Sequence, residues 1–278
     1  MIPRDSVLRK LPVIIEAQQR LRLESLVFSI DLLTLAFASL RDLAARHGSN
    51  VVDLSDTERM AMFLHAWTMV DQVHVIRQLL RDLSDGEMGK TLGKFYSDFE
   101  SAHHLRNKMD HLRMNIQNLA TRKGMRAPLF GAISYLVVEP HQVTQHEAKC
   151  SINGATAITI MAGSVPDGKS LFPIAVAPRQ IPVSAFKLFA FDREIDLEDA
   201  VIQLQVVMTK LGEMLAAQLT EHVDAISKTS EATIEQLMAA LPMSGGMIIA
   251  ATIQYGDETT TTEPKGSLTT HAADDDQP

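Results

Sequence analysis

The segment LESLVFSIDLLTLAFASLRDLAARHG, Leu23 to Gly48, predicts that this chain is built around a long amphipathic helix. Apolar residues recur along it every three or four positions, which is the spacing of one helical face. This face consists of Leu26, Ile30, Leu33, Phe37, Leu40 and Ala44. Because a glycine just past the last periodic residue is a common helix end, we expect a bundle helix from about Leu11 to His47 that stops at Gly48.

Two further helical segments follow. SDTE at Ser55–Glu58 is a capping box, which predicts the start of a second helix, and SDG at Ser84–Gly86 is expected to end it. The apolar face of this helix is predicted to be Met60, Phe63, Leu64, Trp67, Val70, Val73, Ile76 and Leu80. A third helical region is expected over about Glu87–Thr121. Its buried side is predicted to be Leu92, Phe95, Phe99, Ala102, Met109 and Ile116, with Arg106 at the edge.

The sequence then changes to strand patterns. LFGAISYLVVEP (129–140) and AFKLFAF (185–191) predict strands, and VPDGK (165–169) predicts a turn. AKCSINGATAITIM (148–161) predicts a hairpin, because Asn153-Gly154 suits a type I′ turn.

A further long helix is expected over about 196–226, with Asp196 as its N-cap. Its apolar face is predicted to be Val201, Leu204, Met208, Leu211, Leu215 and Leu219. A short helix near 231–240 and a strand over 246–256 follow.

Together these segments predict an α+β protein that is mainly α. We expect a helical bundle in residues 1–123, and then a small antiparallel sheet with the long helix in residues 124–256. Residues 257–278 contain six acidic residues, one lysine and few apolar ones, so we expect an acidic tail without regular structure.

Composition restricts the class of protein. A hydrophobic content of 46% over 278 residues is enough for a substantial core. A single cysteine, Cys150, excludes an intrachain disulfide framework and suits a reducing compartment. The N-terminus lacks an apolar run of signal-peptide type, and no window approaches ~20 uninterrupted apolar residues. We therefore expect a soluble, cytoplasmic protein that does not associate with a membrane.

Charge is distributed unevenly along the chain. The net charge of −8 argues against broad electrostatic binding to nucleic acid. Residues 102–126, however, hold six basic residues against the single acid Asp110, a local net charge of +5. This basic segment contains HHLRNKMDHLR, His103 to Arg113, in which three histidines and three cations occur together.

Within it, RNKMDH at Arg106–His111 resembles the R-x4-6-H motif of HEPN-domain proteins, which are helical bundles found in bacterial toxins, antiphage systems and RNA-processing nucleases. A polar residue often follows the arginine in that family, and Asn107 matches. The resemblance implies a homodimer whose facing motif helices pool two copies of the motif into one cleft. It also implies RNA cleavage without a metal or another cofactor. It covers about residues 12–121 as a helical arrangement and six residues as a motif.

The same spacing occurs at Arg41…His47 and Arg59…His65. The first pair closes a helix, where cations complement the helix dipole, and the second begins a helix with Met60 after the arginine. Asn107, the two preceding bundle helices and the surrounding positive charge favour the third copy.

The residue types suit phosphodiester chemistry. Neutral His111 can accept the proton of an RNA 2′-hydroxyl, and Arg106 can hold the scissile phosphate and its growing charge. Asn107 can orient the phosphate or the histidine, while Lys108 and Arg113 can position the RNA backbone. The product would be a 2′,3′-cyclic phosphate. In an ideal helix Arg106 and His111 point about 140° apart, so we expect a wrapped arginine or a second protomer to complete the site.

Other interpretations stay open. The segment can be a solvated charged face, or part of a non-catalytic HEPN-like dimer that acts as an interaction or RNA-binding module. A metal site would draw on His103, His104, Asp110 and His111. A cognate antitoxin or another partner protein is also compatible with the resemblance. On the second helix, Asp71 and His74 predict a buried hydrogen bond that supports the bundle, with a supporting role in the cleft as the alternative.

Overall fold

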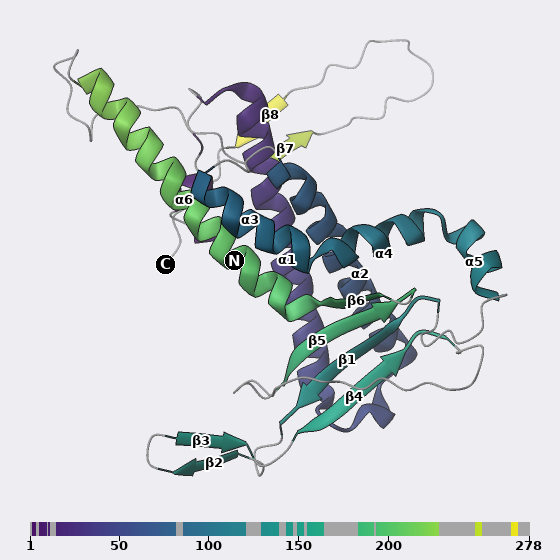
Figure 1. Cartoon of the computed structure of the whole chain (residues 1–278). Coiled ribbons are helices and arrows are strands. Elements are labelled where there is room, and N and C mark those ends of the chain that lie inside the picture. Colours follow the sequence, from purple (N-terminus) through teal and green to yellow (C-terminus); the bar gives the residue numbers. More distant parts are fainter. Residues whose placement is uncertain are drawn as a thin grey trace.

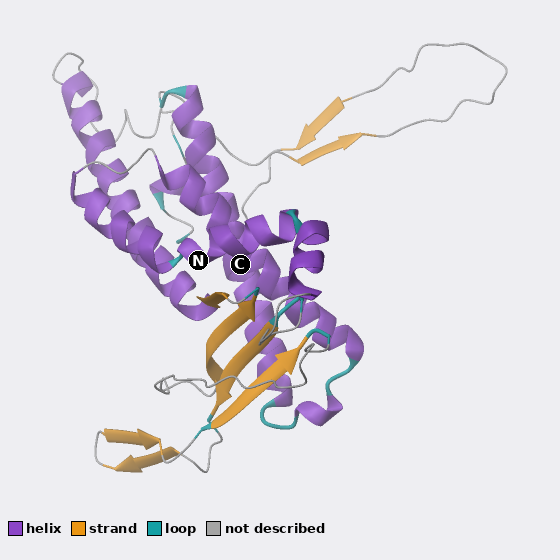
Figure 2. Ribbon diagram, turned by 45° about the vertical axis from the view of Figure 1, so that its right-hand side comes forward, coloured by secondary structure: helices purple, strands orange, loops and turns teal. Residues whose placement is uncertain are grey.

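A computed structural model gives the architecture of the chain (Figures 1 and 2). It confirms a mainly helical α+β protein with a small antiparallel sheet. The residues it describes are 2–3, 6–9, 11, 15–81, 86–120, 129–138, 143–146, 149–152, 155–163, 183–191, 193–227, 248–251 and 268–271.

The described elements alternate in chain order between helical and β segments. The α-helices are α1 (Ala17–His47), α2 (Asp56–Leu80), α3 (Gly86–Asp98), α4 (Glu100–Asp110), α5 (Leu112–Ala120) and α6 (Leu197–Ser227). Two 3-10 turns, η1 (Val7–Arg9) and η2 (Val51–Asp53), flank α1. The strands are β1 (Ala132–Val137), β2 (Val143–His146), β3 (Lys149–Ile152), β4 (Thr156–Met161), β5 (Val183–Ala190), β6 (Arg193–Asp196), β7 (Ile248–Ala251) and β8 (Leu268–His271).

Helix α1 has the predicted buried face and the predicted end. All six residues of that face are buried, and Gly48 takes a positive φ of 53° directly after the last turn. The helix begins at Ala17, later than expected, because the Glu16 carboxylate accepts the N–H groups of Gln18 and Gln19 and caps it.

Helix α2 begins with the predicted capping box. Ser55 Oγ accepts the Glu58 N–H at 3.3 Å, and Glu58 Oε2 accepts the Ser55 N–H at 3.1 Å. The Ser55 hydroxyl also donates to Glu58 Oε2 at 2.7 Å. This bond, the one from the Ser55 N–H and a smaller contribution from His47 at the end of α1 lower the pKa of Glu58 to about 2. The predicted face is wrong at Met60 and Leu64, which are each 64% exposed. Helix α2 instead buries a wider face that includes Met62, Ala66 and Met69.

The expected third helix is divided into α3, α4 and α5. The chain leaves helical geometry at Phe99 (φ −114°, ψ 25°) and again at His111 (φ −104°, ψ 31°). The predicted buried side is confirmed from Leu92 to Ala102 and continues through Leu105. It is wrong at Ile116, which is 45% exposed because α5 restarts after the turn at His111.

The sheet has the strand order β4-β1-β5-β6, and every neighbouring pair is antiparallel. The predicted hairpin over 148–161 is wrong, because β3 pairs with β2 while β4 pairs with β1. β1 is buried along its whole length, so it needs a neighbouring strand on each side. One of these strands is β4, in which Ile158 and Ile160 alternate with exposed residues. Asn153-Gly154 and the expected 165–169 turn lie outside the described residues, as does the short helix expected near 231–240.

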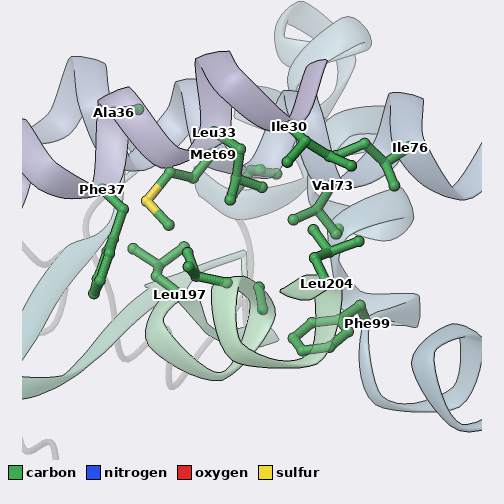
Figure 3. Packing of buried hydrophobic residues seen from close by; sticks show 14 of the residues in the cluster. Ile30, Leu33, Ala36, Phe37, Met69, Val73, Ile76, Phe99, Leu197 and Leu204 are labelled. Carbon is green, nitrogen blue, oxygen red and sulfur yellow. The ribbon is translucent and has the colours of Figure 1, made fainter. Parts of the chain in front are cut away.

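The predicted helix at 196–226 is confirmed as α6, with all six residues of its predicted face buried. Asp196 Oδ1 accepts the Asp199 N–H at 2.8 Å, as expected of the N-cap. Figure 1 shows α6 running from the edge of the sheet across the helices. In Figure 3, Leu197 of α6 lies near Phe37 of α1 and Met69 of α2, and Leu204 lies near Val73 and Phe99, within the core. Helices and sheet therefore share one continuous hydrophobic core.

Two helices, Ala17–His47 and Leu197–Glu221, are long and apolar enough to cross a membrane by length and composition. Each buries 39% of its most apolar window inside the molecule, and the core helix of a soluble protein has the same length and composition. The structure is thus compatible with a soluble protein.

Part of the expected tail is paired. Strand β8 lies within residues 257–278 and runs antiparallel to β7, with Ile248 opposite His271 and Ala251 opposite Leu268. β7 itself falls in the strand predicted over 246–256. The remaining tail residues lie outside the described part of the chain.

A β-bulge joins the sheet to the start of α6. Between the pairs Ser134–Lys187 and Leu136–Ser184, two residues of β5 oppose Tyr135 alone. One of them, Ala185, has a positive φ of 61°, and its N–H donates to the buried carboxylate of Glu198. The side chain of an α6 residue therefore satisfies the N–H of the strained bulge residue.

We expect Glu198→Ala to lower the free energy of unfolding by about 2 kcal/mol, because it leaves a buried N–H without its charged acceptor. Glu198→Gln keeps a side-chain acceptor and should lose less. Urea denaturation followed by circular dichroism measures both. Glu194→Ala, at an exposed carboxylate that pairs with Lys187, is the control and should change stability little. Equal losses for Glu198→Ala and Glu198→Gln would contradict this role.

Candidate functional site

The motif residues occupy α4 and the turn into α5, which project beside the sheet in Figure 1. Asn107, Lys108, His111 and Arg113 are exposed, whereas Arg106 is partly buried. The structure thus places the predicted site on an accessible surface next to α2.

Arg106 links α4 to α2. Its Nε lies 3.0 Å from Asp71 Oδ1, and its Nη1 lies 2.5 Å from Asp110 Oδ1. The side chain is 39% exposed, so it lies at the edge of the core as the sequence predicts. The Nη2 group is in neither ion pair. Two carboxylates therefore hold the guanidinium in one orientation, and among the described residues the Nη2 edge has no ion-pair partner.

The predicted Asp71–His74 hydrogen bond is wrong. Asp71 pairs with Arg106 instead, since a guanidinium is a stronger, charge-assisted donor than a neutral imidazole. His74 Nε2 lies 3.0 Å from the Gln78 amide nitrogen. Burial raises the pKa of Asp71, Arg106 lowers it, and the like charge of Asp110 raises it further.

Two histidines stack between α2 and α4. The rings of His74 and His103 lie 5.2 Å apart at an interplanar angle of 14°. Burial lowers the pKa of His74, and the charges of His103, Arg106 and Arg77 lower it further, against an opposing effect of Asp110. His74 is therefore a neutral imidazole at pH 7.

His111 closes α4, and its own N–H donates to the Asn107 carbonyl at 3.2 Å. Buried Asn115 stabilises the turn, because its Nδ2 donates to the Lys108 carbonyl at 2.7 Å and its N–H to the His111 carbonyl at 3.0 Å. Within the described part of the chain, the His111 imidazole forms no hydrogen bond or ion pair. It is thus free to act as a base. Sequence analysis missed Asn115, although an asparagine within a helical segment is a signal for such backbone bonding.

One residue from each of the other two copies of the motif spacing makes a structural contact with an acidic side chain. His47 Nε2 lies 3.2 Å from Glu58 Oε1, which joins the end of α1 to the start of α2. Arg59 pairs with Asp56 at 2.7 Å on the first turn of α2. Both pairs lie at the α1–α2 connection, away from α4.

The alternative metal site is not formed. His103, His104, Asp110 and His111 all lie in the described ranges, and these ranges contain no group of three or more His, Cys, Asp or Glu residues that could hold a metal ion. His104 Nε2 instead lies 3.6 Å from Glu100 Oε1, and Asp110 pairs with Arg106.

Sequence analysis also missed a groove between α2 and the α3–α4 segment. It has a volume of about 480 Å³, and its lining is His74, Arg77, Gln78, Arg81, Tyr96 and His103. The lining comes from segments far apart in the chain, so no local pattern could indicate it.

No protein-family model, curated protein or solved structure matches this chain. The likeness to HEPN-domain proteins accordingly rests on the six-residue motif and its helical setting.

We expect Arg106→Gln to lower the free energy of unfolding by about 1 kcal/mol at pH 7. Without the guanidinium, burial and the like charge of Asp110 act on Asp71 unopposed, so the pKa of Asp71 in the folded chain rises further above its value in the unfolded chain. Folding then takes up protons, and the loss is relieved as the pH falls through the raised pKa.

Urea denaturation of both proteins at pH 7 and at pH 4 measures the difference between variant and wild type. Adding Asp71→Asn to Arg106→Gln removes the repulsion, so the double variant should lose the pH dependence of that difference. A deficit of the same size at both pH values would show that Arg106 stabilises the fold by packing alone.

Proposed function

We propose that this chain is a metal-independent endoribonuclease of HEPN type, which binds RNA on the α4–α5 surface. The observation that carries the proposal is the exposed, uncommitted imidazole of His111, which follows an arginine that two carboxylates orient. Exposed Asn107, Lys108 and Arg113 surround it with donors for phosphate oxygens.

The proposed reaction is transesterification. Neutral His111 removes the proton of the RNA 2′-hydroxyl, and the 2′-oxygen attacks the adjacent phosphorus. The bond from phosphorus to the 5′-oxygen breaks, which leaves a 2′,3′-cyclic phosphate. The free edge of Arg106 stabilises the charge on the phosphoryl oxygens. In the proposed homodimer, the protonated His111 of the partner subunit would give a proton to the leaving 5′-oxygen.

The dimer is part of the proposal. Met114 is 58% exposed on the first turn of α5, close to His111 in the chain. A second copy that packs here covers this side chain and brings two motifs together. The expected location is the cytoplasm, which contains RNA and keeps Cys150 reduced. A cognate antitoxin or another partner protein would act by covering the same surface.

One observation favours a second candidate function. Asp71 and Asp110 give the Arg106 cluster a net negative charge, which weakens its attraction for phosphate. The second candidate is therefore a non-catalytic helical dimer that binds RNA or another protein without cleaving RNA.

Cleavage of a labelled single-stranded RNA by the full chain tests the catalytic proposal. Removal of a general base typically costs 10²–10⁴-fold in rate, so His111→Ala should reduce cleavage by about that factor. Arg106→Ala should also abolish it. Cleavage should persist in excess EDTA and should fail on DNA, which lacks the attacking hydroxyl.

His104→Ala is the matched control, since His104 is on the same helix but faces Glu100, and it should cleave normally. Circular dichroism confirms that each variant folds. If the wild type binds RNA but never cuts it, the second candidate replaces the first.

Sedimentation of the full chain at micromolar concentration should show a dimer, and Met114→Glu should shift it to monomer by placing a charge in the interface. Met214→Glu is the control, because Met214 is an exposed methionine on α6, at 42% exposure. A wild type that sediments as a monomer would remove the composite site.

A further inference from the structure

The groove beside the motif has an unusual lining. Its six residues supply two guanidiniums, two imidazoles, an amide and a phenol ring, and none of them carries a carboxylate. A volume of about 480 Å³ is within the usual range of small-molecule sites and exceeds what one anion needs. The groove is therefore large enough for a nucleotide unit rather than an ion alone.

Arg77 is held in place on the wall of the groove. Its Nη2 donates to the Tyr96 carbonyl at 3.1 Å, and its guanidinium carbon lies 5.7 Å from the centre of the Tyr96 ring. Its Nε is buried and has no hydrogen-bond partner in the described part of the chain. A buried donor without a partner is costly, and a shift of the Arg77 side chain that exposed Nε to an acceptor in the groove would remove that cost.

Among the described residues, Asp71 and Asp110 are paired with Arg106. Glu100 lies 3.6 Å from His104, and its negative charge also acts on Arg77 without forming an ion pair with it. Among the described residues, neither Arg77 nor Arg81 forms an ion pair. Cations in this position also complement the C-terminal dipole of α2. The helix dipole accounts for two cations at this end of α2. It does not account for the Arg77 Nε, which has no hydrogen-bond partner in the described part of the chain.

We propose that this groove binds a phosphate group, with Arg77 and Arg81 as its cationic ligands and the stacked rings of His74 and His103 as further N–H donors. Guanidiniums suit this chemistry because their planar forks match phosphate oxygens, and arginine stays charged even when it is half-buried. Contacts of this kind fix the position of a nucleic-acid backbone without reading its bases.

The phosphate comes from RNA if the proposed function holds, and this part of the inference rests on that function. His103 lies in the first turn of α4, which begins at Glu100, and His111 directly follows the last residue of that helix; eight residues of helix separate them by about 12 Å. A stacked strand rises ~3.4 Å per nucleotide, so the groove would hold a phosphate about three to four nucleotides from the cleaved bond. A free phosphate or a mononucleotide is the other source of the same chemistry.

The test uses the full chain with two probes, a labelled single-stranded RNA octamer and inorganic phosphate. RNA affinity is measured by fluorescence anisotropy in the His111→Ala background, which prevents cleavage. Phosphate binding is followed by NMR of the His74 and His103 imidazole C–H signals. Arg77→Gln and Arg81→Gln should each weaken RNA binding at least tenfold, and each should reduce the salt dependence by about one phosphate contact.

Arg59→Gln is the matched control, because Arg59 is on the first turn of α2 and pairs with Asp56. It should leave RNA and phosphate binding unchanged. Arg81 is exposed at the end of α2, so Arg81→Gln keeps the test valid if the half-buried Arg77→Gln does not fold. Arg77→Lys, which keeps the charge but loses the fork, should fall between the wild type and Arg77→Gln.

The outcomes separate this inference from the proposed function. If RNA binds and neither groove variant weakens it, the groove inference is overturned while the proposed function stands. If RNA does not bind, but inorganic phosphate shifts both imidazole signals and Arg81→Gln abolishes the shift, the phosphate site stands and its source is not RNA. If neither probe binds, both proposals fail.

Discussion

The packing of α1 against α2 is the constraint on which the rest of the structure depends. The buried face of α1 fixes α2 along its length, and Phe37 extends the contact to Phe186 of β5, with ring centres 5.7 Å apart. Helix α4 in turn packs on α2. Most of the side chains of the candidate site and the groove are therefore placed by α2, which carries Asp71, His74 and Arg77, or by its neighbour α4; Arg113 lies on α5 and Tyr96 on α3. A loss of packing between α1 and α2 would therefore move the site residues of α2 and those of α4 together.

How far the sequence predicts this fold depends on whether the signal is local. The faces of α1 and α6, the capping box at Ser55 and the N-cap at Asp196 are set by residues within a few turns of one another, and the structure confirms them. The sequence does not indicate the break at His111, because the helical periodicity continues across it. Asn115 stabilises that turn by donating to the backbone carbonyls of Lys108 and His111. The pairing of β4 with β1 is also not local. A good turn dipeptide indicates a hairpin, but the fully buried β1 needs a second partner strand, and this requirement decides the pairing.

The same distinction applies to the site. The Arg106–His111 spacing and the surrounding positive charge are visible in the sequence, and the structure places these residues on an accessible surface. The partners of Arg106 are only partly visible, since Asp110 is one helical turn away but Asp71 comes from another helix. The stacking of His74 on His103 and the contact of Arg77 with Tyr96 join separate helices, so they require the packed structure. A spacing of residue types can thus indicate a chemistry without showing which charges oppose it.

The charge of this surface changes along α2, from negative near Asp71 to positive near Arg77 and Arg81. Asp71, with Asp110 and Arg106, forms a cluster of net negative charge, whereas Arg77 and Arg81 further along the helix carry no ion-paired acid in the described chain. Asp71 and Arg81 are separated by about 15 Å of helix, which exceeds the Debye length of about 8 Å at physiological ionic strength. A bound polyanion therefore interacts separately with the acidic cluster and with the two arginines. Phosphates are attracted to the groove and repelled from the acidic cluster, so on our proposals an RNA strand would be anchored at Arg77 and Arg81. Arg106 would then meet a phosphate through the edge that Asp71 and Asp110 leave open, and the repulsion from these acids would restrict cleavage to strands that are already held in the groove.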